Sequence, residues 1–96
     1  MNKTITTQRK LRYVPVKIIN KQIMYFKSAA RYGRDKDGIL RVCKTKWESE
    51  CYENNCMWSE EKAKEILAGI LKYDADKDAE YKLAKITIVE KMNIEM

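Results

Sequence analysis

Apolar residues follow two periods along this chain, and the order of the two periods limits what the chain can fold into. They alternate with polar residues over 11–19, 39–45 and 81–92, and β-branched and aromatic residues gather over 22–27, as in strands. Over 59–73 they repeat at three and four residues, which is the period of an amphipathic helix. A helix with one apolar stripe needs a sheet to cover. The sequence therefore predicts an α+β fold, in which an antiparallel sheet of about four strands carries one α-helix on one face, in the order βββαβ.

Turn residues separate the predicted strands. Asn20-Lys21 lies between the first two strands and predicts a hairpin. Residues 28–38 hold two glycines and a polar run that ends in Asp37-Gly38, so we expect a loop there in which the chain reverses. Pro15 has no N–H to donate and therefore favours an edge position for the first strand.

The third predicted strand has two unlike faces. Leu40 and Val42 fall on one face, and Arg41 and Cys43 fall on the other. Because one helix covers one face of a sheet, the opposite face is left to water, to a second copy of the protein or to a ligand. We therefore expect the functional surface on the uncovered side.

Individual residues predict where the helix begins and how closely it packs. Ser59 is placed as the N-cap, and Glu60 and Glu61 lie in the first turn, where the helix dipole favours negative charge. Gly69 interrupts the apolar stripe at a cost of about 1 kcal/mol relative to alanine. We expect that another backbone packs closely against it.

The segment before the helix shows no clean period, although it is rich in large side chains. Trp47, Tyr52, Met57 and Trp58 form an aromatic cluster in the sequence. We expect these residues to pack in the core under the helix, and a protein-binding hot spot is the alternative.

Length and composition predict a single domain. The chain has 96 residues, of which 45% are hydrophobic and 35% charged, as in a soluble globular protein. Residues 1–10 show no apolar period, so we expect a basic flexible N-terminal arm followed by one α+β domain over 11–96. Because no apolar run approaches the roughly 18 residues that cross a bilayer, we expect no membrane association and a cytoplasmic location.

Charge is divided unequally between the two halves of the chain. The first 46 residues hold 13 Lys and Arg against two acids, and the last 50 hold seven against 12. Nucleic-acid and nucleotide sites combine cations, which neutralise phosphate, with rings, which stack on bases. We therefore predict that the first half binds a phosphate-bearing ligand, either nucleic acid or a signalling nucleotide. Its predicted ligand-binding residues are Arg12, Tyr13, Lys17, Tyr25, Lys27, Arg31, Tyr32 and Arg34.

The segment Ser28–Arg34 is the predicted phosphate-contacting loop. It brings two arginines and a tyrosine together beside small residues, and the guanidinium fork of arginine suits phosphate oxygens. The segment lacks the spaced glycines and the Lys-Ser/Thr pair of a P-loop. Solvated cations on a hairpin connection are the alternative interpretation.

Enzymatic and metal-dependent functions lack their usual residues. The chain has no histidine, which is the commonest general base and zinc ligand, so we expect a non-enzymatic protein without a cofactor. Cys43, Cys51 and Cys56 contain no close C-x2-C pair, and we expect reduced thiols rather than a zinc site. Residues 74–80 imitate the start of a calcium loop but lack its glycine and its last glutamate, so we expect a solvated acidic turn.

The second half carries a family resemblance. Trp58-Ser59 leads through Glu60-Glu61 into the helical stripe, and the final strand includes Ile86–Glu90. This arrangement resembles small phage-encoded accessory proteins of the host-takeover or anti-defence type, in which a strand ending in an aromatic residue passes into a capped helix. The resemblance implies that the phosphate-bearing ligand serves to counter host defence.

Two other functions remain open at the level of sequence. The first is an inhibitor that blocks a host protein or a CRISPR-type effector by direct protein contact, through its uncovered sheet face or its acidic second half. The second is a structural homo-oligomer in which the oppositely charged halves pair head to tail.

Overall fold

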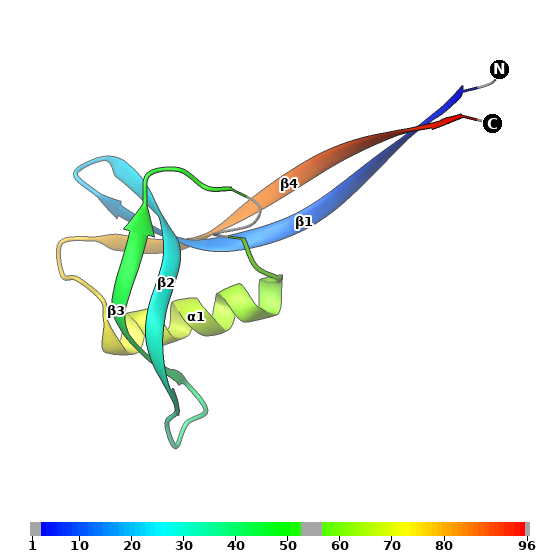
Figure 1. The fold of residues 1–96 in the computed structure, drawn as a ribbon. Coiled ribbons are helices and arrows are strands. Elements are labelled where there is room, and N and C mark those ends of the chain that lie inside the picture. Colours follow the sequence, from blue (N-terminus) through cyan, green and yellow to red (C-terminus); the bar gives the residue numbers. More distant parts are fainter. Residues whose placement is uncertain (1–2, 53–56, 96) are drawn as a thin grey trace.

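The computed structural model of this chain describes residues 3–52 and 57–95. It contains a four-stranded antiparallel sheet in the order β3-β2-β1-β4, with one helix packed on it, and so confirms the predicted α+β fold (Figure 1). The elements are β1 (Lys3–Ile19), β2 (Gln22–Arg34), β3 (Leu40–Glu48), α1 (Glu60–Tyr73) and β4 (Glu80–Glu95).

Two parts of the sheet diverge. β1 and β4 pair along their whole length, from Lys3 with Glu95 to Ile18 with Glu80. β1 pairs with β2 from Ile19 and Gln22 to Val16 and Tyr25, and β2 then turns away with β3 as a separate hairpin. The β1–β4 ribbon therefore projects from the body of the molecule (Figure 1). The radius of gyration is 17.0 Å, whereas a compact domain of this length has about 12 Å.

All four strands extend beyond their predicted bounds, β1 and β2 by the most residues. We expected the first strand to begin near Leu11, and it begins at Lys3 because β4 supplies a partner down to that residue. We expected a loop over 28–38. The chain does reverse around Asp37-Gly38, but the prediction is wrong for 28–34, since β2 continues to Arg34 and pairs with β3. Register shifts accompany this pairing, and the left-handed backbone of Gly33, with φ 75°, lies within the last one.

Pro15 does not lie in an edge strand, because β1 is flanked by β2 and β4. The N–H and C=O of Tyr13 bond to Trp58, on the side of β1 that faces away from β4. Alternate strand residues point their backbone groups to the same side, so the N of Pro15 also faces away from β4. At this position β2 has already separated from β1, and the missing N–H costs no ladder hydrogen bond.

The core lies between the diverging strands and the helix. Its buried residues are Val14, Val16, Phe26, Leu40, Val42, Ile66 and Ile70. Trp47 and Trp58 pack on Phe26 with ring centroids 5.7 and 5.3 Å away, so the core position expected for these two tryptophans is confirmed. Tyr52 is 54% exposed and lies outside the core.

The helix begins as the sequence predicts. Ser59 is the N-cap, and its Oγ accepts a hydrogen bond from the N–H of Lys62. Gly69 lies against β3, where an added Cβ would be 2.5 Å from Cγ2 of Val42 and 2.6 Å from the carbonyl oxygen of Leu40. The close approach expected at Gly69 is confirmed.

The substitution Gly69→Ala tests this approach. Alanine gains about 1 kcal/mol of helix propensity, but the overlap with β3 pushes the helix off the sheet. We expect a net loss of about 1–2 kcal/mol in the free energy of unfolding, measured by urea denaturation. Ala68→Gly at the exposed neighbouring position reports the propensity difference alone. A Gly69→Ala variant more stable than the wild type would contradict the close packing.

Candidate nucleic-acid interface

The β2–β3 hairpin has one face on the helix and one face open. Leu40 and Val42 are buried and lie against Gly69 of α1. The intervening Arg41 is exposed, which confirms the predicted division of this strand into two faces. On the open face, Cys43 pairs with the small residue Ala30.

Cations dominate this hairpin. β2 and β3 each carry three Lys or Arg, and Glu48 at the end of β3 is their one acid. The exposed cations Arg31, Arg41, Lys44 and Lys46 make no ion pair within residues 3–52 and 57–95. We call these four residues the hairpin cations.

A bulge in β3 adds one of the hairpin cations to the strand. Ser28 pairs with Lys46 and Ala30 pairs with Cys43, so β3 has one residue more than β2 between these pairs. Lys44 lies within this irregularity and has a left-handed backbone with φ 51°. Bulges re-aim the side chains that they contain, and Lys44 is exposed between Cys43 and the next cation along the strand.

The exposed ring of Tyr32 lies in the same strand as the first hairpin cation. The side chain of Tyr32 is 63% exposed, next to Arg31 in β2. Ala30 has a small side chain, so a ligand can approach the backbone at this point. Residues 28–34 therefore lie on a strand instead of a loop, and the neighbours Arg31 and Tyr32 point to opposite faces of it.

The other predicted cations are engaged elsewhere. The Nζ of Lys27 lies 2.9 Å from Oε1 of Glu48, and Nη2 of Arg34 lies 3.1 Å from Oε2 of Glu65 in α1. The Nζ of Lys17 is 5.8 Å from the ring centroid of Trp47 and 3.9 Å from Oδ2 of Asp76. Arg12 donates to the carbonyl of Leu11.

The predicted site residues do not gather around one concave spot. Arg12, Tyr13 and Lys17 lie on β1, and the five others lie on β2, which leaves β1 after Tyr25. Tyr13 is partly buried beside Trp58, and Tyr25 is partly buried against the core. Of the predicted residues, Tyr32 lies on the open hairpin face, together with Ala30. Arg31 is exposed but pairs with Val42, so it lies on the face that is turned toward the helix.

Sequence reasoning missed three hairpin cations, all of them in β3. Arg41 was placed correctly on the open face, but without a functional role. Lys44 and Lys46 lie at and beyond the end of the predicted strand, where the bulge breaks the alternation that would have placed them. The positive charge of the run 41–46, which contains no acid, was the available signal.

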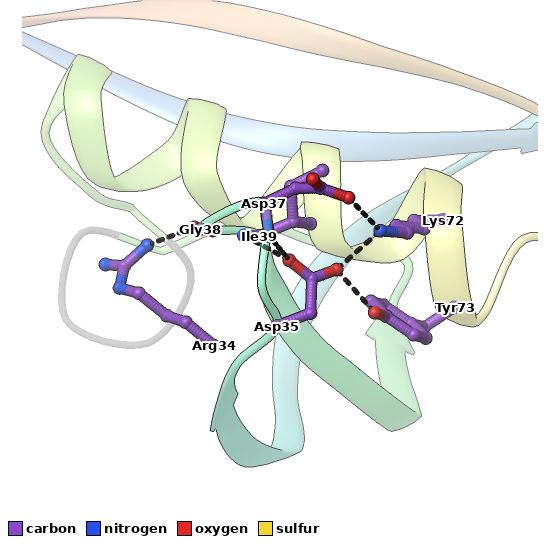
Figure 2. Close-up of polar contacts among 7 residues, drawn as sticks. All are labelled: Arg34, Asp35, Asp37, Gly38, Ile39, Lys72 and Tyr73. Carbon is purple, nitrogen blue, oxygen red and sulfur yellow. Dashed lines mark hydrogen bonds and ion pairs between the residues drawn. The ribbon is translucent and has the colours of Figure 1, made fainter.

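A polar cluster ties the tip of the hairpin to the helix (Figure 2). The side chain of Asp35 is 6% exposed, and its Oδ1 accepts hydrogen bonds from the N–H groups of Asp37 and Ile39. Its Oδ2 accepts from Nζ of Lys72, at 2.5 Å, and from the hydroxyl of Tyr73. We call this arrangement the Asp35 clasp.

The clasp stabilises the charged forms of its members. The ammonium of Lys72 and the hydroxyl of Tyr73, followed by backbone N–H groups, hold the pKa of Asp35 well below its ordinary value of 3.8. Asp35 in turn raises the pKa of Lys72 above its ordinary value of 10.5. Arg34 adds a second contact at this end, since its Nη1 donates to the carbonyl of Gly38 at 2.9 Å.

The acidic turn has a structural role. Oδ2 of Asp74 accepts hydrogen bonds from the backbone N–H and the hydroxyl of Thr45 in β3. Oδ1 of Asp76 accepts from the N–H of Asp78. Asp74 therefore helps to hold β3 at the end of the helix.

No metal site is apparent in the described part of the chain. Residues 3–52 and 57–95 hold no group of three Cys, Asp or Glu side chains that fits a metal ion. Cys43 is a free thiol, Cys51 is half-buried, and Cys56 lies outside the described residues.

The Asp35 clasp predicts a specific pH dependence of stability. A carboxyl whose folded-state pKa is lowered contributes stability above its ordinary value of 3.8, and this contribution is lost as the pH falls through the folded-state pKa. We expect the wild type to be more stable than Asp35→Asn near neutral pH. The difference should shrink as the pH falls from about 6 to about 2.

Urea unfolding followed by tryptophan fluorescence measures this difference. The matched control is Asp78→Asn, because Asp78 is exposed and its side chain has no ion pair among the described residues. The control should match the wild type at every pH. A gap between wild type and Asp35→Asn that stays constant with pH would show that the carboxylate charge does not hold the clasp.

The chain was compared with known protein families, proteins and structures. Neither models of protein families, nor curated proteins, nor solved structures match the chain. No helix of the described residues is both long enough and apolar enough to cross a membrane.

Proposed function

We propose that this protein binds nucleic acid through the hairpin cations. The observation that carries the proposal is that Arg31, Arg41, Lys44 and Lys46 are exposed, make no ion pair in the described part of the chain, and lie on two strands, β2 and β3, that carry a single acid. That acid, Glu48, is already paired with Lys27. The hairpin therefore presents positive charge that its neighbours do not neutralise.

The arrangement of the hairpin cations favours a polyanion over a single nucleotide. Strand residues rise by about 3.4 Å each, so Arg41 and Lys46 are separated by roughly 15 Å along β3. The phosphates of one nucleotide cannot reach both side chains, whereas successive phosphates of a strand can. The open face of a hairpin also differs from the concave sites that enclose small molecules.

The composition of the surface favours binding with little sequence preference. Phosphate contacts position a protein but carry no sequence information. Tyr32 offers a ring for stacking on a base, and stacking tolerates every base. We therefore propose that electrostatic attraction supplies most of the affinity.

Fluorescence anisotropy of labelled single-stranded and duplex DNA, titrated across a salt series, tests this function. Four neutralised phosphates give a slope of log K against log salt of about −2.8 for single strands and about −3.6 for duplex. Arg41→Ala/Lys46→Ala should reduce the magnitude of the single-strand slope by about 1.4 and weaken binding to all sequences alike.

The matched control is Lys77→Ala/Lys82→Ala, which removes the same charge from exposed positions outside the hairpin. The control should keep nearly the slope of the wild type. Equal slopes for the two double variants would mean that net charge, and not the hairpin, attracts DNA. Affinity that does not change with salt would overturn the proposal, and tight binding of a free cyclic nucleotide would favour a small-molecule site instead.

A further inference from the structure

The projecting ribbon has two open backbone edges. β1 pairs with β4 along one edge, and the bridge between Tyr13 and Trp58 lies on the opposite edge of β1. From Lys3 to Arg12 the described residues provide β1 with no second neighbour, and β4 has none along its outer edge. An isolated two-stranded ribbon is marginally stable in water, and a third strand is needed for independent stability. Long open edges are templates for further pairing.

The backbone direction of each β4 residue follows from the bridge at Tyr13. The N–H and C=O of Tyr13 point away from β4, toward Trp58. Tyr13 pairs with Lys85, so the backbone groups of Lys85 also point away from β1, to the open edge. By alternation, Thr87 and Val89 point their N–H groups outward.

The same alternation fixes the inward residues. Ile86 pairs with Arg12 and Ile88 pairs with Lys10, and these pairs exchange hydrogen bonds within the ribbon. The open edge of β4 is therefore a regular series of unpaired N–H and C=O groups at alternate residues.

We propose that a second copy of this chain adds to the open edge of β4, so that two β4 strands pair antiparallel about a two-fold axis. The result is a continuous sheet through two ribbons. Each ribbon then has the third and fourth strands that it lacks alone.

Charge favours the β4 edge over the β1 edge for pairing between two copies of the chain. The ten residues 3–12 of β1 carry Lys3, Arg9, Lys10 and Arg12 and no acid, so two β1 edges repel each other. β4 carries three lysines and three glutamates over 80–95 and is neutral overall. Two β4 strands can therefore approach without net repulsion.

Exposed apolar side chains on the ribbon support the same partner. Leu11 is 47% exposed and Val89 is 53% exposed, and the register places them diagonally on one face of the ribbon. Pairing of two β4 strands extends this face from one ribbon to two. The interaction is separate from the hairpin cations, which lie on β2 and β3, so it goes beyond the proposed function.

Sedimentation over a micromolar-to-millimolar series, combined with amide hydrogen exchange at the same concentrations, tests the proposal. We expect the mass to rise from 11.4 kDa to twice that value. The amides of Lys85, Thr87 and Val89 should become protected as the dimer forms. The amides of Ile86 and Ile88 should be protected at every concentration.

A proline variant separates pairing of the edge from folding of the ribbon. Thr87→Pro removes an outward N–H and leaves the hydrogen bonds between β1 and β4 in place, so it should stay folded and monomeric. Ile88→Pro removes an inward N–H and should destabilise the ribbon itself. Amide hydrogen exchange in the wild type shows whether the β4 edge pairs, even if Thr87→Pro does not fold.

Three results would overturn the proposal. The first is a monomer over the whole concentration series. The second is a dimer in which the outward amides of β4 exchange as fast as in the monomer, which would place the interface elsewhere. The third is new protection of the outward amides of β1, at Arg9 and Leu11, with growth to larger assemblies, which would indicate head-to-tail pairing of β4 with β1.

Discussion

The backbone bridge between Tyr13 and Trp58 is the constraint on which the rest of this structure depends. It occupies the side of β1 that β2 vacates after Tyr25, and it brings Trp58 onto Phe26 just before the helix begins. β2 and β3 are therefore free to form a separate hairpin over α1, while β1 and β4 continue outward as a ribbon (Figure 1). Both proposed interaction surfaces, the hairpin cations and the β4 edge, exist because the sheet divides at this point.

Folding pairs three cations of the basic first half with acids of the second half. Lys17, Lys27 and Arg34 come from the basic half, and each lies within 4.0 Å of an acid from the second half. The Asp35 clasp does the reverse, because an acid of the first half binds Lys72 of the second. The cations that remain unpaired among the described residues, above all those of β3, are therefore more informative about a partner than the total charge.

Close packing and the clasp together orient the hairpin. Gly69 permits β3 to approach the helix, and the Asp35 clasp holds the loop between β2 and β3 against the last helical turn. Asp74 binds Thr45 at the same end of the helix. With one face fixed in this way, the alternate residues of β3 are presented outward, and a surface held in place would lower the entropic cost of the nucleic-acid binding that we propose.

The sequence by itself determined the fold class, the capped helix, the close approach at Gly69 and the two faces of β3. These features follow from the local periodicity of the sequence and from the geometry of single residues. Neither depends on contacts with distant segments of the chain. The tertiary structure alone decided where the strands end and which cations stay unpaired. β1 reaches Lys3 because β4 is there to pair with it, and Arg34 was predicted to contact phosphate but binds Glu65, which lies in another element. Strand pairing and ion pairing are interactions between segments far apart in the chain, so their outcome depends on how the sheet divides.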